Sequence, residues 1–181
     1  MDDVTEIFSD SDTEFSETLR MGLRGTAVNI SLLTTRDLQG RCHGLTVTSA
    51  VPFSTRVPSM IVAVSHAASA FPAIRESGMY CLNQITSKDI ELLDRFSRSD
   101  KRASRFANGD WRAGIRGLPF LATATASFFC TVTSAQTHED QTVFIGRIEG
   151  IRLADCDGFA ESDPLIWING GPAKLAGRAF A

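Results

Sequence analysis

The stretch 142–153 is the sequence feature that most constrains the fold. It alternates apolar and other residues with a period of two, which is typical of a β-strand whose faces meet different surroundings. Phe144 and Ile148 share one parity, whereas Ile151 has the other, and Gly150 stands at the switch. A parity switch at glycine predicts a β-bulge that bends the strand, as closing a barrel requires.

Other strand-like segments accompany it. The segments 28–34 and 45–49 predict a hairpin joined by the turn 37–40, and Pro52 is expected to end its second strand. The run 60–64 is apolar and β-branched on both parities, which predicts a strand buried on both faces. Further strands are predicted at 79–85, 122–133, 142–153 and 165–168. About six strands with two or three short helices predict a mainly β barrel with helical insertions.

Three segments carry helix signals. Residues 15–23 place an apolar residue at every fourth position, which predicts an amphipathic helix. Ser69 is a candidate N-cap and Gly78 a candidate C-terminal stop for a helix that caps one end of the barrel. Residues 86–89 have the form of a capping box before a helix whose buried face is expected to hold Ile90, Leu93 and Phe96. Residues 97–119 predict a short helix and a long excursion, and residues 137–141 a polar loop.

Charge and composition exclude several classes of protein. A net charge of −3 provides no basic surface for binding nucleic acid. No apolar run approaches the roughly 20 residues of a membrane span, so we expect a cytoplasmic protein. Residues 1–13 are acidic and predict a disordered tail, whereas 14–181 predict a single domain. The four cysteines and three histidines share no metal-ligand spacing, which predicts inert thiols and no metal site.

A set of short segments carries a family resemblance. They are Gly40 to Ser49, Val64-Ser65 with Ser69, Leu82-Asn83, Arg95-Phe96, Arg105-Phe106 before Trp111, Phe128 to Cys130 and Val143 to Ile148. In this order, from about 15 to about 169, the chain resembles the flavin reductase-like family of FMN-binding split barrels. That family includes the small reductase components of two-component flavin monooxygenases.

The resemblance implies a split β-barrel with short helical insertions and a homodimer whose flavin sites lie near the subunit interface. It implies reduction of FMN, or FAD, by hydride transfer from NADH or NADPH to flavin N5, and a flavin-dependent monooxygenase as the partner that receives reduced flavin. The cofactors carry this chemistry, so no catalytic nucleophile, acid–base pair or metal is expected among the side chains.

The resemblance also implies binding residues. The strand residues Thr46, Val47, Thr48 and Ser49 are expected along the flavin ring, although Thr alternation is also common in ordinary strands. Ser65 and Ser69 flank the turn into a helix whose N-terminus suits a phosphate, with backbone donors from His66 and Ala67.

Three further positions have two readings. Asn83 is expected either near the flavin or in a purely structural role. Arg105 and Phe106, with Arg102, are expected either to bind phosphates and cover the flavin or to form a solvated face balanced by Asp94 and Asp100.

Two departures from the family pattern leave alternatives to the reductase activity open. Gln141 stands where relatives commonly carry His, and residues 168–172 replace an Arg-Gly-x-Tyr segment. Two alternatives therefore stay open beside the diffusible flavin reductase. One is a flavoprotein with tightly bound FMN that reduces another acceptor such as a corrinoid, and the other is a non-catalytic flavin-binding protein.

Overall fold

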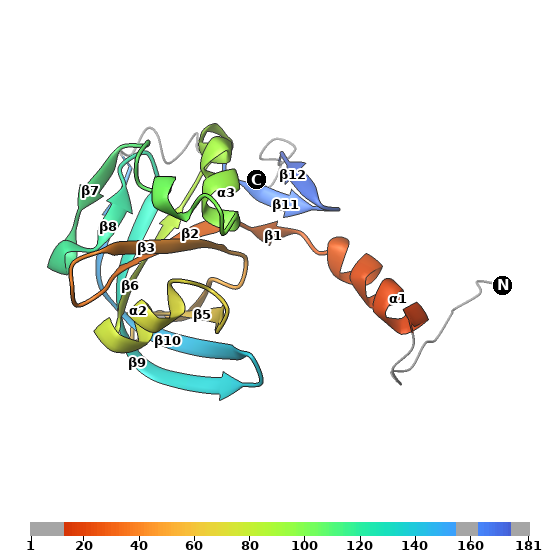
Figure 1. Ribbon diagram of the computed structural model, residues 1–181, viewed down its shortest axis with the longest axis horizontal. Coiled ribbons are helices and arrows are strands. Elements are labelled where there is room, and N and C mark those ends of the chain that lie inside the picture. The colour runs from red at the N-terminus through yellow and green to blue at the C-terminus, as the bar shows by residue number, and fades with distance from the viewer. Residues whose placement is uncertain (1–12, 155–162, 175–181) are drawn as a thin grey trace.

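The computed structural model describes residues 13–154 and 163–174. A seven-stranded antiparallel sheet, in the order β3-β2-β6-β9-β10-β5-β4, forms the body of the molecule (Figure 1). Its strands are β2 (Ser31–Arg36), β3 (Cys42–Val47), β4 (Val51–Ser54), β5 (Ser59–Ser65), β6 (Met79–Gln84), β9 (Ala126–His138) and β10 (Gln141–Leu153). The prediction of a mainly β fold with short helical insertions is confirmed.

Smaller elements surround this sheet. The helices are α1 (Thr13–Arg24), α2 (Phe71–Ser77) and α3 (Ile90–Ser97), with short 3-10 turns η1 (Ser87–Asp89), η2 (Arg102–Ser104) and η3 (Ile115–Gly117). Two minor sheets comprise β1 (Val28–Asn29), β11 (Ile166–Ile168) and β12 (Gly171–Ala173), and the hairpin β7 (Trp111–Ala113) with β8 (Pro119–Leu121). Figure 1 shows α1 standing away from the body beside β1. The predicted tail lies outside the described residues except Thr13, which begins α1.

The two faces of β2 carry the core. Leu33 and Leu82 belong to a buried cluster that includes Ile74 of α2, whereas Leu32 packs with Phe96 of α3 on the other face. Successive strand residues point to opposite faces, so one strand anchors a helix on each side. The sheet is therefore covered by α2 on one face and α3 on the other, which brings the loops that follow β5 and α3 to the same end of β3.

Two β-bulges and the side-chain hydrogen bonds of Ser49 shape the sheet. The register between β9 and β10 shifts between Ile148 and Gly150, which confirms the predicted bulge, and shifts again between Ile145 and Gly146. Ser49, between β3 and β4, places its Oγ 3.0 Å from both the N and the O of Ala63 in β5. The curvature thus brings the connection after β3 against β5.

The residues predicted to begin or end helices and strands are partly confirmed. Gly78 ends α2 in the left-handed conformation with φ of 66°, and the Thr86–Asp89 capping box is formed. The N-cap of α2, however, is Ala70 and not Ser69. Pro52 does not end the preceding strand, since β3 already ends at Val47; it lies in the separate edge strand β4, where a missing ladder donor is tolerated.

Four other sequence predictions need correction. Ile90 is exposed and Leu92 takes its place on the buried face of α3, because the short turn η1 precedes the helix. Among the apolar residues of β5, Met60, Val62 and Val64 are buried whereas Ile61 and Ala63 are partly exposed, so this strand is not equally buried on both faces.

The expected loop at 137–141 is a tight two-residue turn after His138, with Glu139 at φ of 50°, because β9 continues further than its sequence suggests. The excursion at 97–119 includes β7 and leads into β8, with which it forms a hairpin that ends at Leu121. Within the described ranges, no helix has both the length and the apolar character to cross a membrane.

Candidate functional site

A cavity of about 310 Å³ opens where β3, the turn after β5 and the segment after α3 meet. Its lining is rich in hydroxyls and guanidinium groups, and we refer to it as the serine–arginine pocket. It is lined by Leu45, Thr46, Ser65, Ala67, Ala68, Ser69, Phe96, Ser97, Ser99, Arg102 and Arg105. The edge strand β3 forms one wall, and because it pairs only with β2 in the sheet order, its outer edge carries unpaired backbone groups.

The side chain of Arg105 makes four hydrogen bonds at this pocket. Its side chain spans from the pocket into the protein, and the residue is only 5% exposed. Nη1 donates to the carbonyl of Gly44 at 2.5 Å and to Ser69 Oγ at 3.2 Å. Nε and Nη2 donate to the carbonyls of Arg95 and Arg98, both at 3.0 Å. All of these acceptors are neutral, so they fix the guanidinium in place without neutralising its charge.

The nearby carboxylates are engaged elsewhere. Asp94 pairs with Lys101, and Asp100 pairs with Arg98 at 2.8 Å. In the part of the chain that the structure describes, neither Arg102 nor Arg105 forms an ion pair. Burial lowers the pKa of Arg105, and the neighbouring charge of Arg102 lowers it further. A buried cation without a counter-charge is costly, and an anion that brings its own charge removes that cost.

The turn after β5 supplies hydroxyls. Ser65 Oγ accepts from the N–H of Ala67 at 3.3 Å, and the Ser65 carbonyl accepts from Ala68 at 2.9 Å. The N–H of His66 donates to the carbonyl of Asp140 at 2.8 Å. The backbone donors expected at His66 and Ala67 are therefore engaged within the protein. The side-chain groups of this pocket that suit an anion are the hydroxyls of Ser65 and Ser69 and the guanidiniums of Arg102 and Arg105.

The structure gathers four of the predicted site residues and separates the others. Thr46, Ser65, Ser69 and Arg105 line one pocket. Val47 is instead buried in the core of the sheet, Thr48 is exposed, and the Ser49 hydroxyl is engaged by Ala63. Val47 is the last residue of β3 and points to the face opposite Thr46, because strand alternation sends neighbours to opposite faces, whereas Thr48 and Ser49 lie beyond the end of the strand.

His66 and Gln141 lie at the edge of the site. His66 lines a neighbouring cavity, where its Nε2 is 2.9 Å from Thr142 Oγ1 and its ring centroid 4.5 Å from that of Phe71. Gln141 stands opposite Ser65 in the β10–β5 register. Cross-strand partners share a face of the sheet, so Gln141 lies on the same side as the pocket serine.

Asn83 and Phe106 do not line the pocket. Asn83 is fully buried: its Nδ2 donates to the Leu32 carbonyl at 3.0 Å, and its Oδ1 accepts from the Leu121 N–H at 2.9 Å and from Ser127 at 3.0 Å. Its amide links neighbouring segments by hydrogen bonds, which agrees with the purely structural role that was the alternative to flavin contact. Phe106 packs against Phe96 and Trp111 and borders a cavity beyond them.

Sequence reasoning missed part of the pocket. Ser97 ends α3 and Ser99 follows it, and both line the pocket with Ser65 and Ser69, while Leu45 adds an apolar surface beside Thr46. The only signal was the serine-rich run after Phe96, which resembles an ordinary solvated helix end. Arg102 was considered as a phosphate ligand, and the structure places it in this pocket.

The thiols are mostly sequestered. Cys81 and Cys130 are buried, and burial raises the pKa of Cys130 to about 12. Cys42 is exposed, because its strand β3 lies at the edge of the sheet. Cys156 lies outside the described residues. The described ranges contain no cluster of His, Cys, Asp and Glu able to hold a metal ion.

Comparisons with known proteins agree with this architecture. Residues 23–176 match the model of the flavin reductase like domain. The chain is 32% identical over 156 residues to "FMN reductase (NADH) RutF 2" of Methylorubrum extorquens, covering 86% of this chain and 88% of that protein. It is 32% identical over 129 residues to the reductase component of the FADH(2)-dependent resorcinol hydroxylase of Rhizobium sp., covering 71% and 69%. The solved structure of nitrilotriacetate monooxygenase component B from Mycobacterium thermoresistibile superposes with a TM-score of 0.83 at 22% identity, covering 93% and 90%, and so shares the fold.

Proposed function

The chain belongs to the flavin reductase-like family, and on that premise we propose that it reduces FMN, or FAD, with NADH or NADPH as electron donor. The observation that carries the proposal is the buried guanidinium of Arg105, held by neutral acceptors in a pocket of hydroxyl groups. Hydride acceptance at N5 is the chemistry that a bound flavin supplies, whereas the protein binds, orients and excludes water.

The residues of the serine–arginine pocket fit a flavin phosphate. A phosphate monoester carries a charge of about −1.5 to −2 at neutral pH and three strong acceptor oxygens. Arg105 and Arg102 supply two positive charges, while Ser65 and Ser69 supply hydroxyl donors. The match of one dianion to two cations favours FMN, whose phosphate is terminal, over FAD.

The ring of the flavin would follow β3 away from this phosphate site. Thr46 lies at the junction, and the outer edge of β3 offers backbone donors and acceptors of the kind that ring nitrogens and carbonyls require. Thr48 and Ser49 lie further along, and Gln141 borders the site through its pairing with Ser65. His66 would approach only from the neighbouring cavity.

Oxidation of NADH and NADPH, measured with and without added FMN, FAD and riboflavin, tests the proposed activity. We expect oxidation that depends on added flavin, with FMN preferred over riboflavin at low concentration because only FMN presents a phosphate. A yellow purified protein that oxidises the nucleotide without added flavin would support the tightly bound flavoprotein instead. Flavin binding without oxidation would support the non-catalytic alternative.

We further propose a cytoplasmic homodimer that supplies reduced flavin to a monooxygenase. The resorcinol hydroxylase reductase component, a relative of the chain, supports the partner. The helix α1 supports the dimer, since none of its residues is buried and a 12-residue helix is marginal alone in water.

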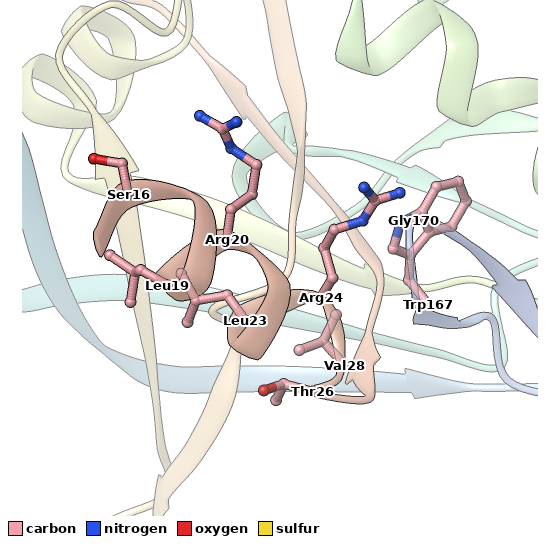
Figure 2. Close-up of a pocket in the computed structure, with 9 residues that line it drawn as sticks. All are labelled: Ser16, Leu19, Arg20, Leu23, Arg24, Thr26, Val28, Trp167 and Gly170. Carbon is pink, nitrogen blue, oxygen red and sulfur yellow. The ribbon is translucent and has the colours of Figure 1, made fainter. Parts of the chain in front are cut away.

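Figure 2 shows Leu19 and Leu23 on one side of α1, and Arg20 and Arg24 directed to the other, where Trp167 stands. The exposed leucines are an apolar surface that a second copy would cover. Sedimentation at micromolar concentration should give a dimer, and the double substitution Leu19→Lys with Leu23→Lys should weaken it. A monomer of the unsubstituted chain would contradict the homodimer and leave the reductase assay unaffected as a separate test.

A further inference from the structure

A second polar cavity lies on the far side of the aromatic cluster that backs the serine–arginine pocket. It has a volume of about 280 Å³ and lies between the β2–β3 turn and the β7–β8 hairpin. Arg36, Cys42, Phe106, Trp111 and Arg112 contribute its functional groups. It shares no lining residue with the serine–arginine pocket. The proposed flavin site therefore leaves this cavity without an assigned ligand.

The guanidinium of Arg36 is fixed at this cavity by two turns. Its Nε donates to the Gly40 carbonyl at 2.8 Å. Gly40 and Gly117 both have left-handed backbones, with φ of 84° and 73°, and a Cβ on either would lie within 2.9 Å of an Arg36 nitrogen. Both glycines thus provide the space that the planar guanidinium occupies, and this holds the group beside the cavity.

The positive charge of Arg36 is not neutralised by its neighbours. Across the described ranges, Arg36 forms no ion pair within 4.0 Å. The adjacent carboxylate of Asp37 is engaged by Arg41 at 2.7 Å and by His43 at 2.9 Å. Arg112 is already paired with Asp110 at 2.8 Å. Arg36 is therefore the cation of this cavity that a ligand carboxylate would meet.

An aromatic wall stands beside that cation. Trp111 and Phe106 meet edge to face with ring centroids 5.0 Å apart, and Trp111 stacks on Phe96 at 5.4 Å. The indole Nε1 donates to the Asn108 carbonyl at 2.9 Å, so its polar group is satisfied and its orientation is fixed. The Cys42 thiol has its pKa raised, mainly because the surrounding protein atoms partly desolvate it, and adds no negative charge.

We propose that this cavity binds a planar aromatic carboxylate. The ring would pack against Trp111 and Phe106, and the carboxylate would accept a charge-assisted, fork-like pair of hydrogen bonds from Arg36. The volume is just below the roughly 300–1,000 Å³ common for ligand pockets, which suits one or two fused rings and excludes a dinucleotide. The inference stands independently of the proposed reductase activity.

Fluorescence provides a direct test, because Trp111 is one of only two tryptophans in the chain. In the Trp167→Phe protein, all indole emission comes from the cavity, and benzoate is a suitable probe when excitation is near 295 nm, beyond its own absorption. We expect saturable quenching by benzoate and at least tenfold weaker binding of the neutral analogue benzamide. Acetate, which lacks the ring, should not saturate.

Matched variants assign the binding to the cavity. Arg36→Gln should weaken benzoate binding at least tenfold, whereas Arg56→Gln, an exposed arginine outside the cavity, should leave it unchanged. If Trp167→Phe does not fold, calorimetric titration of the full, unsubstituted chain and of Arg36→Gln gives the same comparison. Equal quenching by benzoate and benzamide, or unchanged binding in Arg36→Gln, would overturn the proposal.

Competition separates this site from the flavin site. Saturating FMN should leave the benzoate affinity within about twofold, because the two cavities share no residue. Displacement of benzoate by FMN or NADH would instead assign the cavity to the reductase ligands and overturn the proposal. Failure of benzoate to bind has no bearing on flavin reduction, so the two proposals fail by different observations.

Discussion

His43 and Gly44 are neighbours on β3, and each contacts a buried charge, the carboxylate of Asp37 and the guanidinium of Arg105 respectively. The two charges differ in whether a group of opposite charge pairs with them. His43 and Arg41 surround the carboxylate of Asp37, which also accepts the N–H groups of Gln39 and Arg41 at 3.0 and 2.8 Å. The Gly44 carbonyl instead helps to hold the guanidinium of Arg105, whose acceptors are all neutral.

The pKa of Asp37 shows that hydrogen bonds outweigh the cost of burying its carboxylate. Burial by itself would raise the pKa, yet hydrogen bonds from His43 and Arg41 lower it far below its ordinary value. For Arg105, burial lowers the pKa, and within the described part of the chain no carboxylate pairs with the guanidinium to restore it. A buried charge with its own counter-charge stabilises the fold, whereas one without it is suited to an anionic ligand. The following experiments test that distinction.

The largest effect is expected from removing the uncompensated charge. Arg105→Gln should raise the Kd for FMN at least about 100-fold, or about 2.8 kcal/mol, because the phosphate then enters a pocket without its buried cation. The affinity for riboflavin, which has no phosphate, should change less than about threefold. Quenching of flavin fluorescence measures both constants.

The variant Arg102→Gln is the control for structural damage caused by the loss of Arg105. Arg105 also ties the carbonyls of Gly44, Arg95 and Arg98, so its loss can disturb the loop. Arg102 is exposed and carries charge into the same pocket, so Arg102→Gln should selectively weaken FMN about tenfold with an unchanged Tm. Equal losses for FMN and riboflavin in both variants would remove the phosphate from this pocket.

A smaller effect is expected at Ser69, whose hydroxyl accepts from Arg105. Ser69→Asp should neutralise that guanidinium and repel the phosphate, which lowers FMN affinity at least about tenfold, or about 1.4 kcal/mol. Ser69→Ala is the matched control and should cost only a few-fold. Because Ser69 is not the N-cap of α2, neither variant should change helix content. Unchanged FMN affinity in folded Ser69→Asp would exclude Ser69 from the site.

The paired charge should influence stability and not binding. Since the folded pKa of Asp37 is lowered, its contribution is complete above the unfolded pKa of about 4 and is lost as pH falls below that value toward the folded pKa. Asp37→Asn should therefore lower the Tm at pH 7 and flatten the decline of Tm below about pH 4. FMN affinity at pH 7 should stay within twofold, and a larger change would show that the two buried charges are coupled through β3.

The smallest effect is expected at the edge of the site. Gln141 lies opposite Ser65 and stays neutral at every working pH, whereas an imidazole there would gain a charge near pH 6.5. Gln141→His should leave the fold and the maximal reductase rate nearly unchanged but add a pH dependence between roughly pH 5.5 and 7.5. Rates with saturating FMN and limiting NADH measure it. Identical profiles for the two proteins would place Gln141 outside the hydride-transfer site.

Much of the fold was predictable because its signals are local. The bulge at Gly150, the stop at Gly78 and the box formed by Thr86 and Asp89 depend on backbone conformation within a few residues. The hairpin β7–β8 was not predictable, since its three-residue strands are too short to show a period. Ser69 was misassigned as a cap for a similar reason, because one residue of offset decides which side chain reaches a helix end.

The amino-acid sequence was enough to establish the family resemblance, the strand-rich architecture and four of the residues that meet in the pocket, Thr46, Ser65, Ser69 and Arg105. It left the charge balance undecided, because Asp100 is equally near to Arg98 and to Arg102 in sequence, and Asp94 is almost as near to Arg102 as to Lys101. Only the tertiary structure showed that these carboxylates pair with Lys101 and Arg98, and that Arg105 turns inward. The contacts of Arg105 with Gly44 and Ser69 join segments that are far apart in sequence, and they exist only once α2 and α3 have packed on opposite faces of β2.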